Sequence, residues 1–295
     1  DPRVRSQLEQ MLLSWINNDR LRRDVHREDR FIQVLLFNKA TIAIEMFHDS
    51  FEWTEEQNKN LSDWLDRRSV EMFPSDTPPL SKKCPTNHKI NNFKSYEACQ
   101  NGGILRAQAL LRVGIWNSDP EFIEMAYLAF HRYMSGIRKD GSNLTDARRG
   151  CTAADYNIWA SQFMSDFLFH WDRISDPLWG KTFHTTVTPN KSVEYSLSLF
   201  GNFEEINKHT VKDQWRGCGE NEKNMTQKAS TQYGERYYPR ISFAPYFDDK
   251  GEFLELLLDN DRLSEENYTA QSGANYEISL LDSNHTVWAL LCGEH

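Results

Sequence analysis

The sequence predicts a mainly α-helical protein built from antiparallel helical hairpins. Apolar residues recur at helical spacing through the first two-thirds of the chain, and short segments rich in turn-forming residues separate these stretches. The chain has 295 residues, which is enough to bury a sizeable core, and it contains no visible repeat of fixed length. We therefore expect one domain over residues 1–295 that becomes less regular from residue 181 onward.

The helices expected in the first third of the chain come in a clear order. The first has one apolar face, made of Leu8, Met11, Leu12, Trp15 and Ile16. Residues 31–47 form a longer apolar stretch. A third helix starts with a capping box between Thr54 and Gln57. Its buried face is Leu61, Trp64 and Leu65. Pro74 ends this helix and opens a loop to about Ile90.

The middle of the chain predicts three more helices. One includes residues 104–113, and the next begins at Ser118-Asp119-Pro120, with proline in its first turn. The turn Asp140-Gly141-Ser142 precedes a further helix, expected from about residue 152 to residue 171. After Asp176-Pro177 the helical pattern loosens, and residues 181–193 are β-branched in places.

Composition excludes several classes of function. The 43 acidic residues outnumber the 34 Lys and Arg, and the net charge of -9 argues against a general nucleic-acid-binding surface. No run of apolar residues is long enough to span a membrane. The chain has no Gly-rich phosphate loop and no metal-ligand spacing, so neither a cofactor nor a metal is expected. Aromatic residues make up 13% of the chain, a density typical of a core and also of a cleft that binds sugar rings.

Two features favour a secreted or periplasmic protein. The five cysteines lack CxxC spacing and predict one or two disulfides and a free thiol. Six Asn-X-Ser/Thr sequons are present, at Asn60, Asn143, Asn190, Asn224, Asn267 and Asn284. The given chain begins without a basic and apolar leader, so we expect that a signal peptide has been removed.

Two segments carry the residue types that chemistry requires. The first, residues 91–100, leads into a helix, and the second, residues 140–150, is followed by Tyr156. If residues 149–156 are helical, Arg149 and Tyr156 lie about two turns apart on one face. Because a nearby arginine stabilises a phenolate, this pair suits removal of an acidic carbon-bound proton and protonation of a leaving oxygen.

In these two segments the chain resembles the alginate lyase family, whose members have an (α/α) toroid fold. Asn91-Asn92 with Tyr96 resembles an asparagine-containing segment that the family carries at a helix start. The family's second segment is matched in order and spacing by Asp140-Gly141, Asp146, Arg149 and Tyr156. The resemblance covers roughly residues 50–170 and implies an incomplete (α/α) toroid with a less regular C-terminal part.

The resemblance implies a catalytic role for each matched residue. Asn92 and Arg149 would neutralise the carboxylate of a uronate sugar and so stabilise the enolate formed when its C5 proton leaves. Tyr156 would act as acid and, for some substrates, also as base. The family's histidine base falls on Phe93. Three readings follow: Tyr156 takes both roles, another histidine enters the site, with His88 the nearest in sequence, or lyase activity has been lost.

The substrate is expected to contact Asn91, Lys94, Tyr96, Arg148 and Trp159. In a second register, Asn101 replaces Asn92 as the carboxylate-binding residue. We predict a secreted, monomeric polysaccharide lyase that cleaves alginate or a glucuronan by β-elimination without a cofactor. Two alternatives remain open: a non-catalytic carbohydrate-binding protein on the same scaffold, which Phe93 favours, and a toroid glycoside hydrolase with Asp146 and Asp155 as candidate carboxylates.

Overall fold

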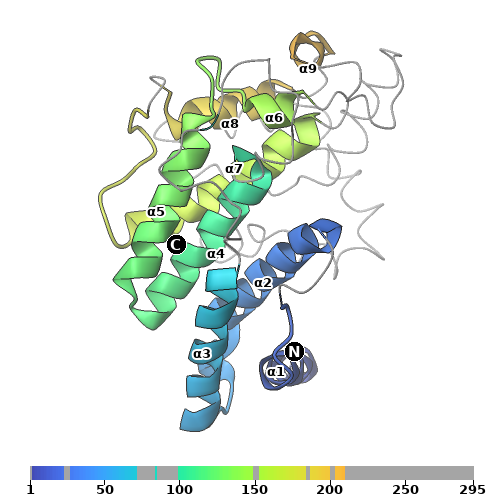
Figure 1. The fold of residues 1–295 in the computed structure, drawn as a ribbon, viewed down its shortest axis with the longest axis vertical. Helices are drawn as coiled ribbons and strands as arrows, with labels where there is room; N and C mark the ends of the chain where they lie inside the picture. The colour runs from blue at the N-terminus through green and yellow to red at the C-terminus, as the bar shows by residue number, and fades with distance from the viewer. Residues whose placement is uncertain are drawn as a thin grey trace. The chain divides into compact units, whose positions relative to one another are not determined.

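Helices, and no β-strands, form the part of the chain that the structure describes (Figure 1). The computed structural model describes residues 2–22, 27–71, 84, 99–148, 153–183, 187–199 and 203–209. None of the helices in these ranges is long and apolar enough to cross a membrane. The prediction of a mainly α-helical chain is confirmed. The chain divides into two compact units, Asp1–Cys84 with Asn92–Tyr133 and Pro85–Asn91 with Met134–His295, and the predicted single domain stays a prediction.

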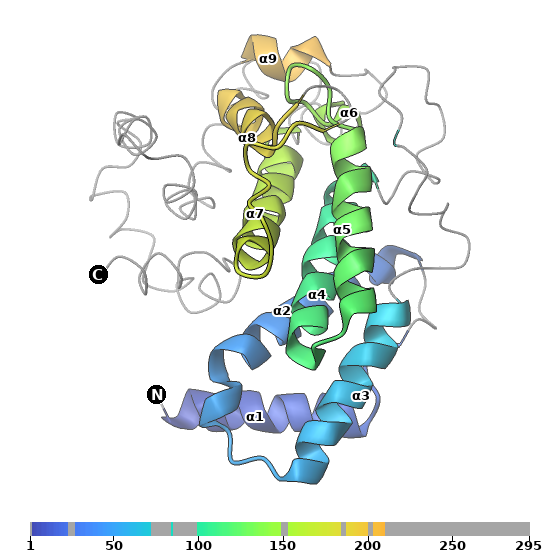
Figure 2. The ribbon, with the colours of Figure 1, turned by 90° about the vertical axis from the view of Figure 1, so that its left-hand side faces the viewer.

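The first unit contains the helices that the sequence predicts before residue 134, together with a short 3₁₀ helix that it does not predict. They are α1 (Pro2–Asn17), α2 (Arg27–Phe47), the 3₁₀ helix η1 (His48–Ser50), α3 (Glu55–Glu71), α4 (Asn101–Asn117) and most of α5 (Pro120–Ser135). α4 and α5 lie side by side in both views and are joined by a two-residue turn (Figures 1 and 2). This pair is a helical hairpin of the predicted kind.

α4 is the central helix of the first unit. Every residue from Asn101 to Gly114 is buried, and the helix contacts α2 and α3, which both contact α1. A helix buried on all sides must pair its polar groups, because an unpaired buried charge is costly. The Arg112 Nε donates to Glu45 Oε2 at 3.0 Å, and its Nη1 donates to Asn38 Oδ1 at 3.2 Å. Because both partners belong to α2, these contacts tie α2 to α4.

Side chains cap the starts of α3 and α5 as the sequence predicts. The Thr54 N–H donates to Gln57 Oε1 at 2.8 Å, and the Gln57 N–H donates to Thr54 Oγ1 at 3.2 Å. This reciprocal pair is the predicted capping box. At α5, which begins at Pro120, Asp119 Oδ1 accepts from the Glu121 N–H at 2.8 Å. At both helix starts, the capping side chain and the backbone N–H that it accepts from are no more than three residues apart.

A disulfide joins Cys84 to Cys99, whose Cα atoms are 5.6 Å apart. It closes residues 85–98, which lie outside the described residues, into a covalent loop. At least one of the predicted disulfides is thus present. The remaining cysteines are outside the described residues: Cys151, Cys218 and Cys292. Cross-linking a loop of about 15 residues stabilises a fold by about 3 kcal/mol in the chain-entropy account.

In the second unit, α7 (Ala153–Asp172) packs against α6 (Leu144–Ala147) and α8 (Pro189–Ser198), and α9 (Phe203–Lys208) follows them. The helix predicted from about residue 152 to residue 171 is confirmed by α7. Hydroxyl groups join α7 to α8: Ser196 Oγ lies 2.7 Å from Ser161 Oγ and donates to the Asn157 carbonyl oxygen at 3.1 Å. These contacts satisfy polar groups that are buried between two helices.

α8 was not predicted from the sequence. β-branched residues before it suggested that the helical pattern had ended at Asp176-Pro177, and the apolar face of α8 is short, with Val193 as its central buried residue. Two local signals nonetheless mark its start. Thr188 Oγ1 accepts from the Lys191 N–H at 3.3 Å, and Pro189 occupies the first helical position.

Replacing Thr54 by alanine should lower the free energy of unfolding by about 1 kcal/mol, because the Gln57 N–H loses its acceptor. For a chain of this size the melting temperature should fall by roughly 2–4 °C, as measured by circular dichroism during heating. Thr54→Ser keeps the hydroxyl and should keep the melting temperature. An equal loss in both variants would contradict the capping role.

Candidate active site

The turn at residues 138–143 positions the polar side chains of the second unit. Gly141 has a φ of 91°, in the left-handed region that favours glycine, and its N–H donates to the Arg138 carbonyl oxygen at 2.8 Å. Ile137 and Asn143 pair across the turn as an isolated bridge. The predicted turn at Asp140-Gly141-Ser142 is therefore confirmed.

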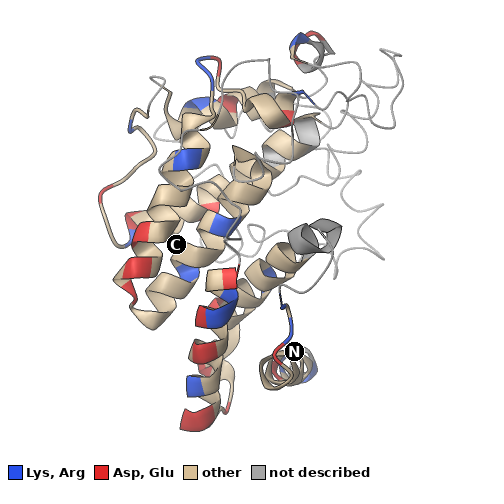
Figure 3. Ribbon diagram, in the orientation of Figure 1, with Lys and Arg blue, Asp and Glu red and all other residues tan. Residues whose placement is uncertain are grey.

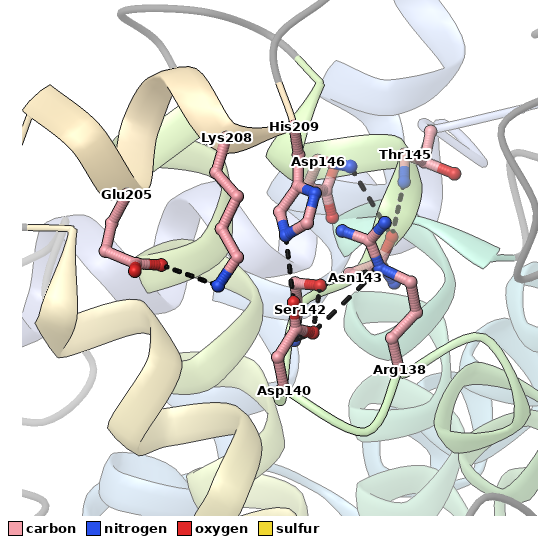
Figure 4. Close-up of polar contacts among 9 residues, drawn as sticks. All are labelled: Arg138, Asp140, Ser142, Asn143, Thr145, Asp146, Glu205, Lys208 and His209. Carbon is pink, nitrogen blue, oxygen red and sulfur yellow. Dashed lines mark hydrogen bonds and ion pairs between the residues drawn. The ribbon is translucent and has the colours of Figure 1, made fainter.

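The carboxylate of Asp140 is the centre of a group of polar side chains (Figure 4). Its Oδ1 accepts from the Ser142 N–H at 3.0 Å and from the Ser142 hydroxyl at 2.5 Å, and its Oδ2 lies 2.9 Å from His209 Nε2. Arg138 Nε donates to Ser142 Oγ at 2.8 Å and lies 4.0 Å from Asp140 Oδ1. We call Arg138, Asp140, Ser142 and His209 the Asp140 cluster. It joins the turn to the residue directly after α9.

Opposing effects act on the ionisation of the cluster. Burial raises the pKa of Asp140. Hydrogen bonds from His209 and Ser142 and the charge of Arg138 lower this pKa by more than burial raises it, so it lies well below its ordinary value. For Arg138, burial lowers the pKa and the nearby charge of Arg148 adds to this, while Asp140 opposes both. Asp140 is therefore ionised at neutral pH, and two guanidinium groups lie close enough to repel each other.

Tyr195 of α8 lies beside the Asp140 cluster. Its side chain is 4% exposed, and its ring centroid is 6.3 Å from that of His209. Burial raises the pKa of the Tyr195 hydroxyl, and the negative charge of Asp140 raises it further. A Cβ added to Gly141 would collide with the Lys191 carbonyl group and with Tyr195, so the turn packs directly on α8. Glycine is thus required at position 141 by its φ and by the space available.

Asn143 and the residues after it complete this region. The Asn143 Oδ1 accepts from the N–H groups of Thr145 at 3.0 Å and Asp146 at 3.4 Å, and so caps α6. Asp146, one of the two candidate hydrolase carboxylates, is 0% exposed. Arg148, a predicted substrate-binding residue, is also buried and follows α6 directly. The carboxylate of Asp146 therefore does not face solvent.

Two of the predicted site residues meet on the first two turns of α7. Tyr156 and Trp159 are both half-buried, with ring centroids 6.2 Å apart and ring planes at 68°. Asn157 between them turns inward, where its Nδ2 donates to the Ala153 carbonyl oxygen at 2.7 Å. A phenol hydroxyl and an indole ring therefore lie together at one place on α7.

Most of the other predicted residues lie outside the described part of the chain. They are His88, Asn91, Asn92, Phe93, Lys94, Tyr96 and Arg149, together with the side chain of Asp155. Asn101, the alternative to Asn92, is the buried first residue of α4, and its Oδ1 accepts from the Gly102 N–H at 2.9 Å. Sequence reasoning missed His209, because it meets Asp140 across a separation of 69 residues with no local signal.

Charge is distributed unevenly among the described helices. Figure 3 shows acidic and basic residues alternating along α3, whereas the ribbon of α7 carries few charges. In the ranges that the structure describes, no three His, Cys, Asp or Glu residues gather in a way that could hold a metal ion. The expectation that the protein needs no metal stays a prediction.

Two glycines provide a matched test of the turn. Gly141→Ala should destabilise the fold by more than about 1 kcal/mol, because alanine meets both a positive φ and a steric collision. Gly180→Ala should change the stability by less than about 0.5 kcal/mol, since a Cβ there meets nothing within 4 Å. Urea unfolding measures both changes, and equal effects would contradict the packing described here.

The depressed pKa of Asp140 predicts how stability depends on pH. Its contribution is fully present above the unfolded-state pKa of about 4 and is lost as the pH falls through the lower folded value. Between about pH 5 and pH 2, the stability of Asp140→Asn should therefore fall less steeply than that of the wild type. Urea unfolding at a series of pH values measures the slope. Asp176→Asn, at an exposed position, is the control, and parallel slopes in all three proteins would refute the prediction.

Comparison with known proteins identifies the fold. The chain is similar to alginate lyase A1-III from Sphingomonas species A1, with a TM-score of 0.58, 16% identity and coverage of 84% of this chain and 63% of that one. A tyrosine-to-phenylalanine variant of alginate lyase A1-III, complexed with a tetrasaccharide, gives a TM-score of 0.57 at 17% identity, over 72% of this chain and 56% of that one. A histidine-to-alanine variant, also complexed with a tetrasaccharide, gives 0.57 at 16% identity, over 69% and 53%.

The chain thus spans less than two-thirds of the length of these structures. No protein-family profile matches the sequence, and no curated protein matches it. The predicted resemblance is confirmed at the level of structure: this mainly α chain has the helical (α/α) fold of the alginate lyases, which is a fold of polysaccharide lyases.

Proposed function

We propose that this protein is a secreted, monomeric polysaccharide lyase that cleaves a uronic-acid polymer, alginate or a glucuronan, by β-elimination. One observation carries the proposal: Tyr156 and Trp159 pair at the start of α7, shortly after Arg148-Arg149, in a chain with the fold of the alginate lyases. A tyrosine, an indole ring that can stack on a sugar and adjacent cations are groups suited to this reaction on an anionic polymer.

The proposed reaction needs only groups of the protein. A base removes the C5 proton of a uronate, the electron pair forms the C4–C5 double bond, and the bond from C4 to the leaving oxygen breaks. Tyr156 takes the C5 proton and returns a proton to the leaving oxygen, since Phe93 stands where the family has its histidine. Arg149 and an asparagine, Asn92 or Asn101, neutralise the carboxylate and stabilise the enolate. The new non-reducing end carries an unsaturated uronate.

The charges of the second unit support an anionic substrate. The net charge of -9 repels a polyanion at long range, so binding requires cations concentrated in one place. The charge of buried Arg148 contributes to the lowered pKa of half-buried Arg138, so the two guanidinium groups repel each other. A carboxylate bound near them would relieve their repulsion. Arg149 adds a third cation to the same stretch of chain.

Phe93 favours one alternative, a non-catalytic carbohydrate-binding protein on the same scaffold. Such a protein would keep the sugar-binding groups but lack the histidine base. A glycoside hydrolase is less well supported, because hydrolysis needs two carboxyl groups placed at the scissile bond, and the candidates Asp146 and Asp155 have no diagnostic spacing.

The lyase activity is measured by the ultraviolet absorbance of the unsaturated uronate with alginate, polyglucuronate and pectate as substrates. Tyr156→Phe should lower kcat by roughly 10²–10⁴-fold, because it removes the proton that is transferred. Arg149→Ala should lower it by about 10²–10³-fold, because the enolate loses a stabilising charge. Tyr127→Phe is the matched control, since Tyr127 is a half-buried tyrosine of α5 outside the proposed site, and it should keep the wild-type rate.

Three outcomes would redirect the proposal. Calorimetric binding of an alginate tetrasaccharide, without any rise in absorbance, would support the binding protein. New reducing ends without the absorbance would indicate hydrolysis. Full activity in Tyr156→Phe would reject the assignment of this residue and leave the lyase activity itself standing.

A further inference from the structure

Three of the six sequons lie on described residues, at Asn60, Asn143 and Asn190. An N-linked glycan is bulky and hydrophilic, so the asparagine that carries it must remain at the surface after folding. Burial therefore separates the sequons that the folded protein can accept from those that it cannot.

The fold requires the side chain of Asn143 for another purpose. Asn143 is 1% exposed, and its Oδ1 caps α6 by accepting from two backbone N–H groups. The other two residues of this sequon, Leu144 and Thr145, are buried as well. A glycan on the Asn143 Nδ2 would pull the side chain away from the cap and open α6. Asn190 is half-buried in the first turn of α8, and its Oδ1 is buried.

Asn60 differs from both of these residues. It is exposed near the middle of α3, between Glu56 and Asp63, which are exposed one turn to either side of it. The ion pair nearest to it in sequence, from Lys59 to Asp63 at 3.5 Å, also lies at the surface. The buried face of the helix is made by other residues: Leu61, Trp64, Leu65, Arg68 and Ser69. A glycan on Asn60 therefore extends into solvent and displaces neither a packed side chain nor a cap.

We infer that Asn60 is an N-glycosylation site of this protein and that Asn143 is not. The Cys84–Cys99 disulfide supports folding in an oxidising compartment, the kind of compartment in which such glycans are added. The choice between the two asparagines rests on burial and hydrogen bonding, and it holds whether or not the protein is a lyase.

The modification is a transfer from a lipid-linked oligosaccharide diphosphate, which serves as the co-reactant. Asn60 Nδ2 forms a bond to C1 of the first sugar, and the bond from C1 to the diphosphate oxygen breaks. The lipid diphosphate leaves with the electron pair, and the amide loses one proton to a base of the transferase. The hydroxyl of Ser62 completes the acceptor sequence, Asn60-Leu61-Ser62.

The full chain, directed into the secretory pathway of a eukaryotic cell line, tests the inference. Enzymatic removal of N-glycans in ¹⁸O-water converts each glycosylated asparagine to a labelled aspartate, which peptide mass spectrometry detects. The Asn60 peptide should carry the label and the Asn143 peptide should not. Asn60→Gln and Ser62→Ala should each abolish the label at position 60, whereas Ser62→Thr, which keeps the sequon, should retain it.

Asn143→Ala tests whether Asn143 serves as a helix cap and not as a glycan acceptor. It should lower the melting temperature, because α6 loses its cap, and should leave the glycan at Asn60 unchanged. An unlabelled Asn60 peptide from the wild-type protein would overturn the inference. A labelled Asn143 peptide would overturn it equally.

Discussion

The ionised carboxylate of Asp140 is the interaction on which the described part of the second unit depends. One side chain closes the turn through Ser142, holds Arg138 and contacts His209, so it joins segments that are 69 residues apart. Partial burial of a carboxylate costs desolvation free energy, and here hydrogen bonds and a cation offset that cost. The turn also packs on α8, and α6 begins directly after it. The contacts of the turn therefore position the start of α6, which precedes the proposed site residues in the sequence.

The first unit depends on a different constraint, the burial of α4 from Asn101 to Gly114. Its polar residues must find partners inside the unit, and Arg112 does so by pairing with Glu45 and Asn38 of α2. This helix begins two residues after Cys99, so the disulfide links Cys84 to the start of the buried helix. Of the two candidates for the carboxylate-binding asparagine, Asn92 lies between the bonded cysteines in the sequence, and Asn101 is the first residue of α4.

Local features of this fold were predictable from sequence, and long-range ones were not. The capping box at Thr54, the turn at Gly141 and the helix that carries Tyr156 and Trp159 depend on residues a few positions apart, which sequence spacing reveals. α8 was missed because its apolar face is short, although Thr188-Pro189 marks its start. The contact between His209 and Asp140 could not be predicted, because only tertiary packing brings the two side chains together.

The Cys84–Cys99 disulfide sets the distance between the two ends of residues 85–98. The Cα atoms of the two cysteines are 5.6 Å apart, and the covalent bond keeps this separation whatever the length of the peptide that joins them. In polymer terms, each doubling of a flexible loop costs only about 0.6 kcal/mol of closure entropy. A longer or shorter peptide between these two cysteines would therefore change the free energy of folding by little, since the cross-link holds its two ends.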